Sequence, residues 1–226
     1  MGFEFPACQD CQHRYRQEEQ YFAFICRMCD RDNANYDRDT SRRLISGVAN
    51  NLKHLLPNPH LSAIEKRRGL KSLGLSKPLG MASSDIPVVE LPPEIDPVLR
   101  AVAIKIGLAL FYRHKGSVAK SHYGVAAYWS QFSDQTAMQK LSRIAKELSG
   151  AEIGRRPNLE FGNRFQYRWS KEAEGEPDIF VCLARFGLGL TICVMIADIT
   201  NWASDEFDEE WVTLGRWASE KFFEVF

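Results

Sequence analysis

The chain has 226 residues, of which 45% are hydrophobic and 12% aromatic, so a chain that is disordered throughout is excluded. Its 29 Lys and Arg residues balance 29 Asp and Glu residues. A net charge of zero excludes the strongly basic field that many nucleic-acid-binding proteins carry over their whole surface.

The amino-terminal part is predicted to form two helices after a short irregular segment, residues 1–14. The first helix covers residues 17–31, where apolar side chains recur at the spacing of one helical face: Tyr21, Phe24, Ile25 and Met28. The second covers residues 40–54, with Thr40 or Ser41 as its N-cap. Pro57 and Pro59 close it.

Residues 58–93 are basic at first and then rich in Gly, Ser and Pro, which is typical of a connector; a short helix is predicted at 63–69. Two longer helices follow, over residues 96–114 and 133–148. Apolar residues surround the first of these on most sides, which predicts a central, buried helix.

In the last part of the chain, from residue 164 on, the alternation of apolar and polar residues predicts strands. Residues 164–170 have period two, and residues 179–185 and 190–197 form a predicted hairpin with a Gly turn. Arg185 near the middle of this apolar stretch and the glycines of the turn favour two buried strands over a membrane span. A final helix is predicted over 208–225, with an apolar stripe: Trp211, Leu214, Ala218, Phe222 and Val225.

These elements predict an α+β fold. A small zinc-knuckle and helix module is expected in residues 1–57, the connector in 58–93, and helices packed on a short antiparallel sheet in 94–226. The amino terminus shows no secretory signal, so we expect a cytoplasmic protein.

Four of the six cysteines form two C-x2-C pairs, Cys8 with Cys11 and Cys26 with Cys29, with fourteen residues between the pairs. Zinc prefers four soft ligands in a tetrahedron, and this spacing is typical of a structural site. The alternative is that Cys26 and Cys29 are merely buried on the helix. Cys182 and Cys193, on the predicted hairpin, are interpreted as core residues.

The histidines form no evident site. His13 follows Cys11 closely and is either a substitute zinc ligand or a group near the metal. The others are expected at the surface or at helix ends: His54, His60, His114 and His122. No P-loop, dinucleotide-binding G-x-G-x-x-G or G-x-S-x-G motif occurs.

Charge is distributed unevenly. Residues 42–77 carry eight Lys and Arg against one acid, a local +7, and residues 205–226 carry seven acids against two cations, a local −5. One interpretation is that both runs are solvated faces that can pair with each other. The other is that the basic run binds DNA or RNA through its cations: Arg42, Arg43, Lys66, Arg67, Arg68 and Lys71.

The segment from Pro6 to Phe22, PACQDCQHRYRQEEQYF, resembles the second half of the zinc-bearing module of HNH-endonuclease-like proteins of bacteria and phages. Residues 97–116 and 163–169 also resemble the carboxyl-terminal region attached to that module. The resemblance implies that Cys8 and Cys11 bind zinc. Gln12 departs from the family's usual Asn.

The family's upstream C-x-x-C and its base histidine have no counterpart before Cys8. One explanation is that Cys26 and Cys29 replace the missing pair locally. The others are that the chain begins after the first half of the module, or that it descends from a nuclease that lost this half. We therefore expect a zinc-stabilised nucleic-acid-binding protein, degenerate as a nuclease. The alternative is a non-catalytic interaction protein of a bacterium or phage, whose zinc is purely structural and whose aromatic final helix docks a partner.

Overall fold

The computed structural model describes the chain in segments: residues 13, 15–29, 38–58, 60–72, 82, 89–131, 134–153, 165–170, 179–187, 189–200 and 211–219. The helical elements are α2 (Arg16–Cys29), α3 (Arg38–Asn51), the 3-10 turn η2 (Lys53–Leu55), α4 (Ala63–Ser72), α5 (Ile95–Lys115), α6 (Gln135–Glu147) and α7 (Leu214–Ser219). The strands are β1 (Tyr123–Gln131), β2 (Gly150–Ile153), β3 (Phe165–Trp169), β4 (Ile179–Phe186), β5 (Leu190–Asp198) and β6 (Trp211–Thr213).

The strands form one sheet in the order β2-β3-β4-β5-β1-β6, and every pairing in it is antiparallel. This confirms the α+β class. The predicted hairpin is β4 and β5, in which Phe186 pairs with Leu190 across the turn. Gly187 in this turn has a φ of 58°, a left-handed conformation that glycine adopts without strain.

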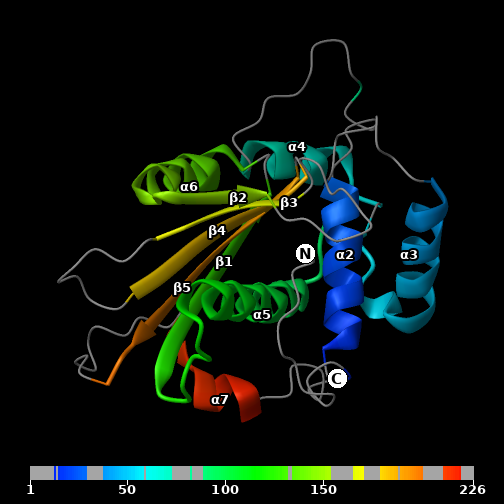
Figure 1. Ribbon diagram of the computed structural model, residues 1–226. Coiled ribbons are helices and arrows are strands. Elements are labelled where there is room, and N and C mark those ends of the chain that lie inside the picture. The colour runs from blue at the N-terminus through cyan, green and yellow to red at the C-terminus, as the bar shows by residue number, and fades with distance from the viewer. Residues whose placement is uncertain are drawn as a thin grey trace.

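Helix α5 is the central buried helix that its apolar sequence predicts (Figure 1). It packs on β1 and β5, and the approach to β5 is close at Gly107. A Cβ on that glycine would lie 2.5 Å from Cγ1 of Val194, so a side chain there would push the helix from the sheet. Gly116 ends the helix with a φ of 70° and donates its N–H to the carbonyl of Tyr112.

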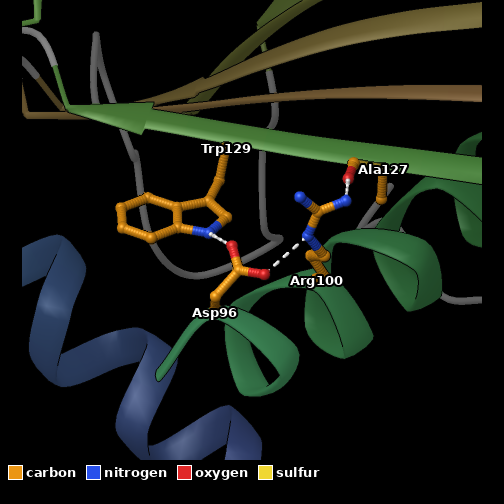
Figure 2. A network of polar contacts seen from close by, with 4 residues as sticks. All are labelled: Asp96, Arg100, Ala127 and Trp129. Atoms are coloured by element: carbon orange, nitrogen blue, oxygen red, sulfur yellow. Dashed lines mark hydrogen bonds and ion pairs between the residues drawn. The ribbon is translucent and has the colours of Figure 1, made fainter. Parts of the chain in front are cut away.

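The amino end of α5 is tied to β1 by a polar network around Asp96 (Figure 2). One carboxylate oxygen accepts a hydrogen bond from the indole N–H of Trp129 at 2.8 Å, and the other accepts one from Nε of Arg100 at 2.8 Å. Arg100 also donates to the backbone carbonyl of Ala127 at 3.1 Å. The bonds from Trp129 to Asp96 and from Arg100 to Ala127 therefore fix the helix on the strand, and the Asp96–Arg100 ion pair lies within α5.

Helix α2 packs against α5 through a buried face that includes Tyr21, Phe24 and Ile25. The apolar core runs without interruption from Tyr15 of the amino-terminal part to Leu214 of α7. The division into residues 1–57, 58–93 and 94–226 stays a prediction, although α2 and α5 share this core.

The carboxyl-terminal prediction was wrong in part. Residues Trp211–Thr213 are strand β6, with Val212 paired to Val125 of β1, and the described helix α7 begins only at Leu214. Pairing with β1 outweighs the local helical periodicity in this segment. Of the predicted stripe, Phe222 and Val225 lie outside the described residues. Across the described part of the chain, no helix has the length and apolar character needed to cross a membrane.

Candidate functional site

The last turn of α2 carries Cys26 and Cys29, three residues apart and hence on one helical face. Both side chains are half-buried and pack against the core. The β4–β5 turn lies directly against this helix end, since a Cβ on Gly189 would come within 2.1 Å of the carbonyl carbon and oxygen of Cys29. Only glycine fits at that contact. We call residues 26–29 the cysteine turn.

The cysteine turn supplies two of the four ligands that the spacing predicts. Cys8 and Cys11, the other two, lie outside the described residues. Within the described segments, no group of three or more His, Cys, Asp and Glu side chains is placed to bind a metal ion, and His13 is exposed. The donor chemistry of the pair suits zinc, and the zinc site stays a prediction.

Arg27 lies between the two cysteines, and its Nε donates a hydrogen bond to Oγ of Ser41 in α3 at 2.8 Å. The sequence offers Ser41 as an alternative N-cap to Thr40, but α3 begins at Arg38, so Ser41 lies one turn inside the helix. It is only 3% exposed. Its hydroxyl serves the contact between the two helices instead of capping.

Helix α4 begins with a capping box that the sequence analysis missed. The Ser62 N–H donates to Oε2 of Glu65 at 2.7 Å, and the Glu65 N–H donates to Oγ of Ser62 at 3.3 Å. Hydrogen bonds that the Glu65 carboxylate receives from the side chain and backbone of Ser62 hold the pKa of Glu65 below its ordinary value. The signal was the S-x-x-E pattern at Ser62, so the helix start was predictable.

The cations of α4 gather mainly on its outer face. Leu70 is buried and attaches the helix to the protein, whereas Ile64, on another side of the helix, is 65% exposed. The exposed face follows the helical spacing i, i+3, i+4, i+7: Ile64, Arg67, Arg68 and Lys71. Lys66 is half-buried and lies on the same side of the helix as Leu70, four residues on, and not on this exposed face.

The other two predicted nucleic-acid-binding residues, Arg42 and Arg43, are exposed on a separate helix, α3. Among the described residues, neither of them forms a salt bridge, and neither do Arg68 and Lys71. Figure 1 places α4, the amino end of α3 and the carboxyl end of α2 towards the top of the molecule. Exposed cations and the cysteine turn therefore lie towards the same end.

A second cluster of reactive residue types, which the sequence did not predict, joins the carboxyl end of α5 to β2 and β3. Glu152 accepts hydrogen bonds from Nε and Nη2 of Arg113 at 3.2 and 2.9 Å, and another from the hydroxyl of Tyr167. Burial raises the pKa of Glu152, but the bonds from Arg113 and Tyr167 outweigh it and leave the pKa lowered. Burial, together with the bond to Glu152, raises the pKa of Tyr167.

This cluster therefore holds an ionised, fully engaged carboxylate and a protonated phenol at neutral pH. Neither group is poised as a base or a nucleophile. Its evident effect is to tie three elements together. His114 beside it was expected at a helix end or at the surface. It lies in the last turn of α5, but its Nε2 atom is buried and has no hydrogen-bond partner within the described segments.

The aromatic final helix expected to dock a partner is only partly described. Leu214 is 7% exposed and belongs to the core, and Trp211 is half-buried in β6. These two side chains are used by the fold itself. Docking by the remainder of that segment stays a prediction.

No protein-family model, no curated protein and no solved structure matches this chain. The likeness to HNH-endonuclease-like modules accordingly stays an expectation drawn from the residues between Pro6 and Phe22, and a functional assignment has to rest on the residues themselves.

Proposed function

We propose that this protein is a zinc-stabilised nucleic-acid-binding protein that contacts phosphates through the outer face of α4, and that it is degenerate as a nuclease. The observation that carries the proposal is the common exposed face of Arg67, Arg68 and Lys71. Three long cationic side chains within two helical turns match the repeated negative charge of a nucleic-acid backbone. Arg42 and Arg43 on α3 would extend the contact.

Zinc has a structural role in this proposal. Bound by Cys8, Cys11, Cys26 and Cys29, it would link the amino-terminal segment to the last turn of α2. The cysteine turn supports this role because its two thiols share a helical face, and because the β4–β5 turn is packed against its backbone.

A charge-replacement experiment tests the α4 surface. Binding of duplex and single-stranded oligonucleotides is measured by fluorescence anisotropy over a salt series. The variant R67Q/R68Q/K71Q should weaken binding of all sequences alike. The slope of log K against log salt should become shallower by about 2.7 for duplex DNA, since each phosphate contact contributes about 0.9.

The matched control is K140Q/R143Q/K146Q, which removes three exposed cations from α6. It alters the net charge by the same amount but leaves α4 intact, so its salt slope should stay close to that of the unaltered protein. Equal losses in both variants would contradict a specific α4 surface. Absence of binding at low salt would favour the alternative, a protein-interaction role.

A further inference from the structure

We infer that the outer face of α4 binds single-stranded nucleic acid in preference to duplex, with the exposed side chain of Ile64 lying against unpaired bases. This inference rests on the proposed function, because it names the class of nucleic acid that the same surface takes. It uses one observation that the cations alone do not supply, namely the apolar side chain that lies among them.

Ile64 lies in the first turn of α4, and its side chain is 65% exposed. Arg67 and Arg68 follow it by three and four residues, so their side chains are its neighbours on the same face of the helix. The one acid of α4, Glu65, accepts a hydrogen bond from the N–H of Ser62 at the start of the helix. Ile64 therefore adds an apolar contact to a surface that is otherwise cationic.

The same combination occurs on α3. Ile45 is 49% exposed and follows Arg42 by three residues, so these two side chains are neighbours on that helix. Among the isoleucines whose burial the structure describes, Ile45 and Ile64 are the only exposed ones. A single exposed apolar side chain is common on a protein surface and needs no explanation. Both of these, however, lie within about one helical turn of an arginine that is assigned to phosphates.

Duplex and single strand differ in what they offer to such a face. In a duplex the bases are paired and stacked, so a helix that lies along the backbone meets phosphates and sugars. In a single strand, unpaired bases lie beside the phosphates, and they can cover an apolar side chain while the cations bind the backbone. Burial of Ile64 against a base removes apolar surface from water, a gain that contact with the duplex backbone does not provide.

An anionic bilayer also combines negative charge with apolar groups, but it fits this face less well. Helices that lie in the interface of a bilayer insert a continuous apolar face and keep their cations on the other side. On the outer face of α4, the positions that follow Ile64 are cationic: Arg67, Arg68 and Lys71. An apolar side chain that shares its face with cations suits a ligand whose charges and apolar surfaces alternate, as they do along a single strand.

The variant I64T tests the preference, because threonine keeps the β-branched shape but removes apolar surface. A labelled single-stranded oligonucleotide without self-complementarity and the duplex formed with its complement are compared by fluorescence anisotropy over a salt series. The unaltered protein should bind the single strand more tightly. I64T should weaken binding of the single strand about tenfold and binding of the duplex less than about twofold. Both salt slopes should stay the same, because no cation is lost.

V118T provides the matched control, because Val118 is 68% exposed but lies outside α3 and α4. It loses the same kind of apolar surface, and its binding of both oligonucleotides should equal that of the unaltered protein. Both variants change exposed side chains, so their Tm values should also stay close to that of the unaltered protein. The charge variant R67Q/R68Q/K71Q should show the converse of I64T, a shallower salt slope with both forms of nucleic acid.

The outcomes separate this inference from the proposed function. Equal losses with the single strand and the duplex in I64T, or no loss with either, would overturn the preference for unpaired bases and leave the cationic surface standing. A loss confined to thymine-rich duplexes would also overturn it, since Ile64 would then contact thymine methyl groups in a major groove. Absence of binding to both oligonucleotides at low salt would overturn the proposed function and this inference together, and binding to phosphatidylglycerol vesicles would then favour a bilayer.

Discussion

His114 lies stacked on Trp169, with ring centroids 3.9 Å apart and ring planes inclined by 16°. Its Nε2 atom is buried and has no hydrogen-bond partner among the residues that the structure describes. Burial lowers the pKa of His114, the nearby Glu152 carboxylate opposes that shift, and Arg113 adds to it. The folded protein therefore favours the neutral imidazole.

The sign of the pH effect follows from this lowered pKa. Because the unfolded chain titrates near 6.5, it takes up the proton first as the pH falls. The contribution of His114 to stability is therefore complete above pH 6.5 and is lost progressively below it, towards the lower folded pKa. We expect urea unfolding at pH 7.5, 6.5 and 5.5 to show this loss, and H114F to reduce it while keeping a ring on Trp169. An unchanged pH dependence in H114F would contradict the assignment.

Tyr167 tests the tie between α5, β2 and β3. Y167F removes one of the hydrogen bonds to Glu152 and leaves Arg113 in place. We expect a loss of about 1–2 kcal/mol in the free energy of unfolding, because the bond is to a charged group but Glu152 is 39% exposed. Chemical denaturation measures this value. A change below about 0.3 kcal/mol would show that solvent replaces the bond.

Metal content tests the cysteine pairs. Protein purified without a metal-affinity tag under reducing conditions should hold about one zinc ion per chain, as measured by plasma mass spectrometry. C8S and C26S should each lower that content. C193A, which removes a buried core thiol, should leave it unchanged. If C26S alters neither zinc content nor Tm, the second pair belongs to the core and does not bind metal.

Nuclease activity should be low. Phosphodiester hydrolysis with one metal needs a base and a divalent ion with an open coordination position, and loss of a general base alone lowers the rate by about 10²–10⁴-fold. Supercoiled plasmid incubated with Mg²⁺, Mn²⁺ or Ni²⁺ should remain essentially uncut. Nicking that persists through purification and disappears in H13A would instead identify the exposed His13 as a base.

Much of the fold was predictable because several elements have strong local patterns. The apolar surroundings of α5 and the two apolar runs joined by Gly187 identify a buried helix and a hairpin. Strand β1 was not predicted. The strand lies between β5 and β6, and four consecutive residues of it, Gly124–Ala127, are buried, so both of its faces are covered. Its sequence therefore lacks the alternation of apolar and polar residues that marks a half-buried strand.

The candidate sites show the same limit. The two cysteines of each C-x2-C pair are close together in the sequence, and so are the basic residues of α4. Both groups can therefore be recognised from local spacing. Arg113, Glu152 and Tyr167 meet only through the pairing of β2 with β3 and the packing of α5. The bond from Arg27 to Ser41 likewise joins two helices across fourteen residues. No local pattern encodes such contacts.

The salt dependence of DNA binding by the unaltered, zinc-containing protein tests the central claim most directly. Five exposed cations are assigned to phosphates: Arg42, Arg43, Arg67, Arg68 and Lys71. The account predicts measurable binding of duplex DNA at about 50 mM salt, with a slope of log K against log salt of about −4.5, independent of sequence. No binding at that salt concentration, or a slope near zero, would contradict it.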